Sequence, residues 1–398
     1  MWTGLLHRAL TRAVRHGRLR LTYPDGHQMT YGAGLPDVGV RLSDAALPKK
    51  LLLNPELALG EAYMDGSLQI ENDDLHGFVT LMIRIAVGGT LPPALALIRA
   101  ARKGVKRMRQ ANPLARAAQN VAHHYDLHDA FYRRFLEADM QYTCAYYRWP
   151  GMSLEEAQAA KMDHIAAKLL LQPGMRVLDI GCGWGGLALR LARLHGVHVT
   201  GVTLSEVQMQ AARKRAAEMG LQDRVEFRLQ DYRAVPGRFD RVVSVGMMEH
   251  VGQPQFATYF SKIHDILQPE GVALVHFIGR STGPTALSPW FQKYIFPGGY
   301  APAFSEVMPA IERSGLVMAD VEVWRGHYEQ TLRHWQDRFE ATLPQTRAEF
   351  DETFVRMWRY YLVNAEMSFV EMGQVLFQVQ LTKARLGTPP SRDYLYKN

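Results

Sequence analysis

The sequence is poor in cysteine and has no long apolar run. Its 398 residues include two cysteines, Cys144 and Cys182, which are too few for a disulfide scaffold and are typical of a reducing compartment. No stretch reaches the length of about 18 apolar residues that predicts a membrane-spanning helix. The arginine-containing start, MWTGLLHRALTRAVRHGRLRL, lacks the apolar core of a signal peptide. We therefore expect a cytoplasmic protein without a transmembrane helix.

Acidic residues are also in deficit. The chain has 39 Asp and Glu against 46 Lys and Arg, for a formal net charge of +7 and a pI near 9.3. This balance favours an anionic partner, and both nucleic acid and an anionic membrane fit it. A basic surface that is merely solvated fits it equally well. Charge alone leaves these alternatives open.

The chain divides into three predicted regions, because its length favours a large domain plus a smaller one. Residues 1–98 read as a small α+β domain, with a hairpin pattern around a Pro-Asp-Gly turn in LRLTYPDGHQMTYG. Residues 99–120 form a basic linker, RAARKGVKRMRQANPLAR, which is either a solvated helix or a membrane-facing segment. Residues 121–398 contain alternating strand and helix patterns, which predict an α/β domain with a doubly wound parallel sheet.

A glycine loop follows the first strand of this larger region, in VLDIGCGWGG. Glycines allow the backbone to approach a ligand closely. Asp179 precedes Gly181 by two positions, and a carboxylate there suits a cationic group better than the pyrophosphate of a dinucleotide. The next strand ends in GVTLSEVQ, without an acid at its tip to hold an NAD ribose. The pattern resembles the first motif of class I S-adenosylmethionine (SAM) methyltransferases, whereas a tight turn needed only for packing is the simpler alternative.

An ordered set of segments extends this resemblance. HHYDL, QYTCAYY, VLDIGCGWGGLA, GVTLSEVQ, LQDYR, VSVGMMEHVG, HFIG and YIFPGGYAP together resemble the cyclopropane-fatty-acyl-phospholipid synthases, from about residue 115 to the C-terminus. LALGEAYMDG extends the match into the N-terminal region. The resemblance implies a Rossmann-like class I SAM methyltransferase domain. It also implies the addition of a methylene from SAM across a cis double bond of a membrane phospholipid.

The resemblance further implies a bound bicarbonate or carbonate ion beside the methyl donor. The ion residues carried over by position are Cys144, Glu249, His276, Ile278 and Tyr361, with adjacent Tyr360 as the alternative tyrosine. The residues carried over for SAM are Tyr142, Thr143, Asp179, Gly181, Gly183, Thr203, Leu204, Gln208, Asp231 and Tyr232.

Small departures from the family pattern accompany these residues. Thr143 stands where serine is commoner, and Phe277 where threonine is usual. Asn364 and Glu366 stand where relatives have small or apolar residues, which leaves the substrate preference open. No metal is predicted, because the histidines of HHYDL and MMEH lack closed zinc spacing.

The proposed chemistry accounts for these residue types. An alkene is a weak nucleophile, so it needs the electrophilic methyl of SAM, and ring closure then needs a base amid hydrocarbon. A carboxylate alone there would tend to take up a proton, whereas a bicarbonate held by several groups can act as the base. We therefore expect the segment around Tyr142 and Thr143 to contact the donor and Cys144 to contact the ion.

Two other functions compete with ring closure. The same scaffold could methylate the alkene and release a methylene- or methyl-branched chain. A nucleic-acid methyltransferase or basic binding module is disfavoured, because GMMEHVG stands where an Asn-Pro-Pro-Tyr motif would follow the fourth strand. The resemblance implies peripheral contact with phospholipids at the inner membrane surface, no nucleic acid, and a homodimer.

Overall fold

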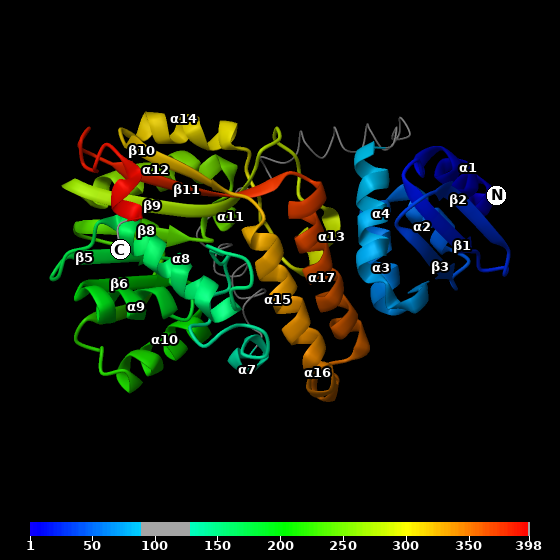
Figure 1. The fold of residues 1–398 in the computed structure, drawn as a ribbon, viewed down its shortest axis with the longest axis horizontal. Coiled ribbons are helices and arrows are strands. Elements are labelled where there is room, and N and C mark those ends of the chain that lie inside the picture. The colour runs from blue at the N-terminus through cyan, green and yellow to red at the C-terminus, as the bar shows by residue number, and fades with distance from the viewer. Residues whose placement is uncertain (89–127, 397–398) are drawn as a thin grey trace. The chain divides into compact units, whose positions relative to one another are not determined.

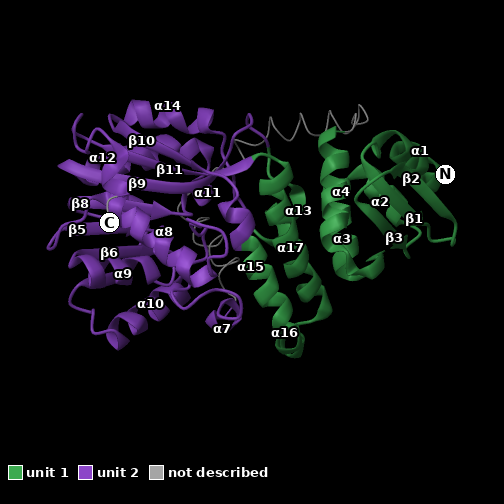
Figure 2. Ribbon diagram, in the orientation of Figure 1, with its two compact units in different colours: residues 1–106, 286–296, 332–373 green, residues 107–285, 297–331, 374–398 purple. Residues whose placement is uncertain are grey.

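The computed structural model describes residues 1–88 and 128–396 (Figure 1). The predicted basic linker, residues 99–120, therefore lies outside the described residues. The chain forms two compact units, coloured separately in Figure 2. Unit 1 comprises residues 1–106, 286–296 and 332–373, and unit 2 comprises residues 107–285, 297–331 and 374–398. Two segments from the second half of the chain thus group with the N-terminal residues, and the predicted domain boundaries stay a prediction.

Unit 2 is built on a seven-stranded sheet in the order β10-β11-β9-β8-β5-β6-β7. The strands from β9 to β7 along this order are parallel, whereas β11 pairs antiparallel with both β9 and β10. This order confirms the predicted doubly wound α/β fold. The strands are β5 (Arg176–Ile180), β6 (His198–Thr203), β7 (Val225–Leu229), β8 (Phe239–Val245), β9 (Leu267–Arg280), β10 (Val317–Trp324) and β11 (Gln374–Thr382).

Helices cover both faces of this sheet, because its central strands are apolar on both sides. In β5, Val177 contributes to the core beneath α8, α9 and α10, whereas Leu178 contributes to the core beneath α12 and α14. Neighbouring residues of a strand point to opposite faces, so one strand feeds both cores. The helices of unit 2 are α7 (Asp129–Tyr132), α8 (Leu154–Leu169), α9 (Gly186–His195), α10 (Glu206–Glu218), α11 (Met248–Val251), α12 (Phe256–Ile266) and α14 (Phe304–Ser314).

Unit 1 combines a four-stranded sheet, in the order β2-β1-β3-β4, with helices from both ends of the chain. The predicted hairpin is confirmed, since β1 and β2 pair antiparallel. Helix α17 packs against α3 and α4, and α13 packs against α3. The elements are α1 (Trp2–Ala13), β1 (Gly17–Thr22), β2 (Gln28–Ala33), β3 (Asp37–Leu42), α2 (Leu47–Leu53), α3 (Pro55–Asp65), β4 (Leu68–Ile70), α4 (Leu75–Gly88), α13 (Pro289–Tyr294), α16 (Leu343–Glu349) and α17 (Glu352–Glu371), while α15 (His327–Ala341) begins in unit 2 and ends in unit 1.

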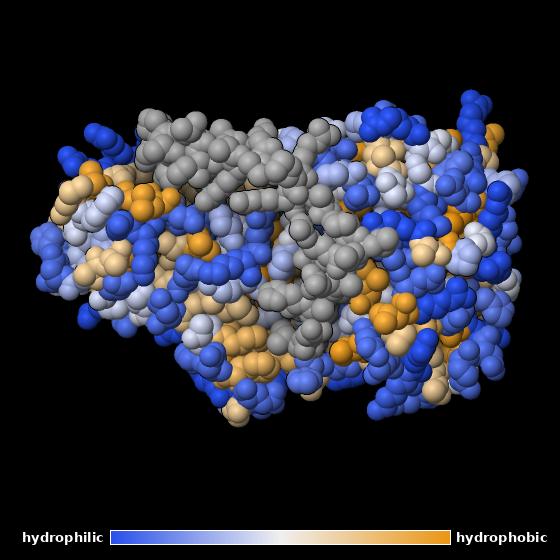
Figure 3. All heavy atoms as spheres, turned by 180° about the vertical axis from the view of Figure 1, so that it is seen from behind, coloured by the Kyte–Doolittle hydropathy of each residue, from blue (hydrophilic) through white to orange (hydrophobic). Residues whose placement is uncertain are grey.

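A helix that crosses a bilayer needs about 20 predominantly apolar residues. Among residues 1–88 and 128–396, none of the helices combines enough length and apolarity to cross one. On the face drawn in Figure 3, hydrophobic side chains form small groups interspersed with hydrophilic ones.

Candidate functional site

The glycine loop, residues 181–186, joins β5 to α9 at the carboxyl edge of the sheet. The N–H groups of Gly181 and Cys182 donate to the carbonyl of Val202 at 2.9 and 3.1 Å, which ties the loop to β6. A Cβ on Gly183 would meet no atom within 4 Å, so this position faces open space. Asp179 is buried at the end of β5, and burial raises the pKa of its carboxyl to about 7. The loop therefore presents open backbone beside a buried carboxyl group.

The next predicted donor contacts follow β6. The Thr203 hydroxyl donates to Gln208 Oε1 at 3.1 Å and accepts the N–H of Ser205 at the same distance. Ser205 caps α10 by accepting the N–H of Gln208. Thr203, Leu204 and Gln208 thus form one turn beside the glycine loop, because carboxyl ends of parallel strands share an edge.

Asp231 and Tyr232 follow β7 at the same edge. Both carboxylate oxygens of Asp231 accept from the Arg233 guanidinium, at 2.8 and 2.7 Å. Tyr232 is buried in the core, with its ring centroid 5.5 Å from that of Tyr259. Their expected contacts with the adenosine of SAM stay a prediction, and Asp231 would have to share its carboxylate with Arg233.

A second segment, residues 137–144, lies against the glycine loop, and we call it the donor segment. A Cβ on Gly186 would lie 2.1 Å from the carbonyl oxygen of Asp139, so only glycine allows this approach. Thr143 extends from the segment to the end of β8, where a Cβ on Gly246 would lie 2.8 Å from its Cγ2. The structure therefore brings Thr143 to the sheet edge that carries the glycine loop.

Glu249 and His276 bring two buried polar atoms to the ends of β8 and β9. The Ile278 N–H donates to Glu249 Oε1 at 2.6 Å, and Gln378 Nε2 lies 3.0 Å from His276 Nδ1. The other polar atoms, Glu249 Oε2 and His276 Nε2, are buried and have no hydrogen-bond partner in the described part of the chain. Such atoms are costly unless a further group satisfies them.

The electrostatics at this pair favour a neutral His276 and a Glu249 carboxyl that titrates near neutral pH. Burial raises the pKa of Glu249 to about 7, although the Ile278 amide acts in the opposite direction. Burial also holds the pKa of His276 well below its usual range, and the charge of Lys161 lowers it further. Because Gln378 Nε2 donates to Nδ1, the neutral imidazole carries its proton on Nε2. The pair therefore offers one hydrogen-bond donor and one carboxyl group, which together suit a hydrogencarbonate ion.

Cys144 lies in a small apolar cluster with Trp324 and Leu376. The thiol is fully buried, and burial raises its pKa strongly, so it stays protonated at neutral pH. Ile278 packs against the same cluster. The structure thus brings Cys144 and Ile278 together, and through Ile278 it connects them to Glu249.

The predicted tyrosine contact to the ion is Tyr361, with adjacent Tyr360 as the alternative, and Tyr328 is a further tyrosine to compare with them. Tyr361 lies on α17 in unit 1, where its ring packs against Phe291, Phe296 and Trp358. Tyr328 lies on α15 in unit 2 and packs against the Cys144 cluster. Tyr328 is not among the predicted site residues, because its segment, RGHYEQTL, is not one of those that resemble the family. Tyr361 stays a prediction, and Tyr328 is a second candidate.

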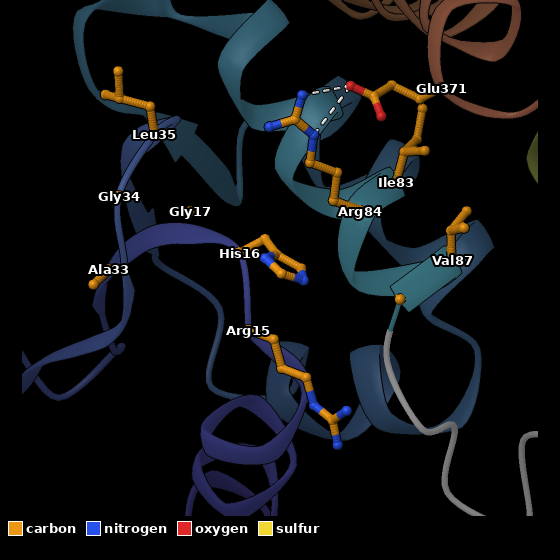
Figure 4. Close-up of a pocket in the computed structure, with 11 residues that line it drawn as sticks. Arg15, His16, Gly17, Ala33, Gly34, Leu35, Ile83, Arg84, Val87 and Glu371 are labelled. Atoms are coloured by element: carbon orange, nitrogen blue, oxygen red, sulfur yellow. Dashed lines mark hydrogen bonds and ion pairs between the residues drawn. The ribbon is translucent and has the colours of Figure 1, made fainter.

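Unit 1 has a groove of its own, about 500 Å³ in volume, among its N-terminal residues (Figure 4). Arg15, His16 and Leu35 line it. At its edge the Arg84 guanidinium donates to Glu371 at 3.0 and 2.6 Å. None of the predicted site residues lines this groove. Within the described residues, no group of three or more His, Cys, Asp or Glu side chains is arranged to hold a metal ion.

Comparison with protein families gives two matches. The family model described as mycolic acid cyclopropane synthetase matches residues 113–379. A model described as a domain of unknown function matches residues 5–86. The first match covers the glycine loop, the donor segment and the residues around Glu249 and His276.

Relatives along the full chain carry related descriptions. A probable fatty acid methyltransferase of Pseudomonas putida is 35% identical over 96% of this chain and 97% of its own length. The cyclopropane-fatty-acyl-phospholipid synthase of Escherichia coli strain K12 is 38% identical over 86% of this chain and 88% of its own length. A tuberculostearic acid methyltransferase of Mycobacterium tuberculosis is 33% identical over 97% of this chain and 92% of its own length.

A solved structure agrees with these sequence matches. The mycolic acid cyclopropane synthase CmaA1, in complex with S-adenosylhomocysteine (SAH) and CTAB, superimposes with a TM-score of 0.64 and 31% identity. The superposition covers 68% of this chain and 99% of that one.

Proposed function

The chain belongs to the mycolic acid cyclopropane synthetase family and is a SAM-dependent methyltransferase, and from this premise we propose that it closes a cyclopropane ring on a phospholipid. In this proposal a methylene from SAM is added across the cis double bond of an unsaturated acyl chain, with bicarbonate as the base. The proposal includes peripheral contact with membrane phospholipids at the inner surface, and a homodimer.

One observation carries the ring-closing part of the proposal. Glu249 Oε2 and His276 Nε2 are buried polar atoms without a hydrogen-bond partner among the described residues. A hydrogencarbonate ion would satisfy both, because its oxygens accept from the His276 N–H and its hydroxyl donates to Glu249. If these groups hold the ion, a base lies at this buried position. A protein carboxylate alone would tend to take up a proton there, because burial raises its pKa.

SAM would supply an electrophilic sulfonium methyl, and the ion would supply the base that accepts the proton lost on ring closure. The glycine loop and the donor segment would hold SAM. The buried Cys144 cluster would exclude water from the reacting carbons, so that solvent does not capture the cationic chain. Glu249 and His276 would hold and orient the ion.

A second candidate function is methylation of the acyl chain without ring closure. The names of the Pseudomonas putida relative and of the mycobacterial tuberculostearic acid methyltransferase favour it. Both reactions use the same donor and the same alkene, and they differ in which proton the intermediate cation loses. The product therefore decides between them.

The test is to incubate the purified protein with SAM and vesicles of an unsaturated phospholipid, and to analyse the lipid by mass spectrometry and proton NMR. Ring closure predicts a product one CH₂ heavier than the substrate, with the strongly shielded proton signals of a cyclopropane. Vinyl signals at the same mass would establish the branched product instead.

The role of the ion is tested separately. Bicarbonate removal, Glu249→Gln or His276→Ala should lower turnover about a hundredfold while changing SAM affinity little. Full-rate ring closure under all three conditions would reject the ion.

A further inference from the structure

Lys161 is a fully buried lysine in the middle of α8. Burial of an ammonium group is costly, so such a lysine needs acceptors that compensate for lost water. Its Nζ donates to Gln141 Oε1 at 2.6 Å and to Thr143 Oγ1 at 2.8 Å. Both acceptors belong to the donor segment. One buried cation thus holds two side chains of a segment whose Tyr142 and Thr143 are predicted to contact SAM.

Gln158, one helical turn earlier on α8, holds the backbone of the same segment. Its side-chain Nε2 donates to the carbonyls of Gln141 at 3.2 Å and Thr143 at 2.8 Å. The helix itself is firmly started, because Ser153 and Glu156 form a capping box. Helix α8 is therefore a fixed support from which Gln158 and Lys161 hold the donor segment.

The donor segment needs such support because its backbone is strained. Met140 has a φ of 56°, in the left-handed region that residues other than glycine rarely adopt. Local strain of this kind persists where surrounding contacts determine the conformation. The Glu137 carboxylate contributes by accepting the N–H groups of Asp139 and Gln141, the latter at 2.7 Å.

We infer that Lys161 is a positioning residue of the donor site, whose ammonium fixes the donor segment in the shape that binds SAM. The inference rests on the proposed assignment of Tyr142 and Thr143 to the donor site. Thr143 is the link, since it accepts from Lys161 and its methyl fills the space beside Gly246 at the sheet edge.

The surroundings of Lys161 give a pH-dependent readout. Burial lowers the pKa of Lys161 to about 8, although the negative charges of Glu137, Asp139 and Asp179 act in the opposite direction. His276, from β9, also faces this charge. The ammonium is therefore charged below about pH 8 and loses its charge above it.

The test compares Lys161→Met with Lys168→Met by calorimetric titration of SAM into the intact protein. Lys168 is a matched control, because it is also fully buried on α8 but pairs with Glu322 and Asp320 of β10. Loss of a buried charged hydrogen bond predicts that Lys161→Met raises the Kd for SAM by about tenfold or more. Lys168→Met should change this Kd less than about threefold, even where it lowers the melting temperature equally.

The pH dependence separates positioning from a general loss of structure. The ratio of the two Kd values, Lys161→Met over wild type, should fall as pH rises through about 8, because the wild-type ammonium then loses its charge. A structural defect alone would leave the ratio flat. If Lys161→Met does not fold, Gln141→Met removes one acceptor of the ammonium and should raise the Kd severalfold.

The results for Lys161→Met and for the wild-type protein test two different statements. Equal SAM affinity of the folded Lys161→Met and wild-type proteins would overturn the positioning role, as would equal effects of the two lysine variants. Failure of the wild-type protein to bind SAM would instead contradict the SAM-dependent function on which the inference rests.

Discussion

At the residue scale, the site is defined by buried polar groups whose neighbours were not evident from their spacing. Cys144, Glu249, His276 and Ile278 were selected from short motifs, and the structure gathers them in unit 2. Lys161 was not selected, because a lysine within LEEAQAAKMDHIAAKL reads as part of a solvated helical face. Its burial depends on the donor segment folding over α8, and helical periodicity contains no information about that contact.

Glu249 should make the folded protein less stable as pH rises. Its folded-state pKa is raised to about 7, above the value of about 4.3 expected when unfolded. The resulting destabilisation is absent below about pH 4, grows between the two pKa values and is complete above pH 7. Glu249→Gln removes it, so the melting temperature of the variant should exceed that of wild type by an amount that increases from pH 5 to pH 8.

Glu312→Gln, at an exposed position on α14, is the control for replacing one glutamate by glutamine. A constant difference between Glu249→Gln and wild type across this pH range would contradict the raised pKa.

The two tyrosines can be separated by removing one hydroxyl at a time. If the Cys144 cluster marks the ion site, Tyr328→Phe should lower turnover about tenfold or more, and added bicarbonate should partly restore it. Tyr361→Phe should then behave almost as wild type, because its ring contacts are kept. Turnover measured against bicarbonate concentration gives the answer, and the reverse ranking would support Tyr361.

At the element scale, the sequence predicted the central strands and the helices between them well. Continuous apolar runs such as MRVLDIG and FDRVVSV indicate strands buried on both faces, and β5 and β8 occupy these segments. The pairing of β11 with both β9 and β10 could not be predicted, because β11 is separated from β9 by nearly a hundred residues of sequence. The segment LLLNPELALGEAYMDG contains the end of α2 and the whole of α3, which are separate helices because Asn54 precedes Pro55 and leaves the helical conformation.

Two glycines of the glycine loop should respond differently to alanine. Gly185 has a φ of 81°, and a Cβ there would lie 2.5 Å from the Phe227 ring. We expect Gly185→Ala to lower the free energy of unfolding by about 3 kcal/mol. Gly183 has a φ of 53° and open space, so Gly183→Ala should cost about 1 kcal/mol. Gly183→Ala should nevertheless raise the Kd for SAM, because the new methyl projects into the proposed donor site.

Denaturant unfolding and calorimetry on both variants distinguish these effects. If Gly183→Ala retained wild-type SAM affinity, the loop would not approach the donor at that position.

At the scale of the whole molecule, the net charge follows from the sequence alone, but the grouping of distant segments into one unit does not. The +7 net charge is read directly from composition, whereas the grouping of residues 286–296 and 332–373 with the N-terminal residues is a property of packing. Ion pairs such as Arg359 with Asp73, at 2.6 Å, join α17 to the N-terminal part of unit 1. Pairing across nearly three hundred residues cannot be predicted from local patterns.

The net positive charge predicts binding to anionic vesicles that weakens as salt rises. Each Lys or Arg near an anionic surface contributes about 1 kcal/mol, and salt at about 0.1 M screens such charges beyond roughly 10 Å.

Two sets of charge reversals locate the surface that contacts the membrane. One replaces Arg102, Lys103 and Lys106 of the predicted linker by Glu, and the other replaces Arg8, Arg12 and Arg15 of the N-terminal region. If the linker segment faces the membrane, the linker variant should sediment less with anionic vesicles than the wild-type protein does. Neutral vesicles are the control. If only the N-terminal set reduces binding, the first residues of the chain form the docking surface. Unchanged sedimentation of both variants would exclude electrostatic attraction through these two basic clusters as the means of membrane contact.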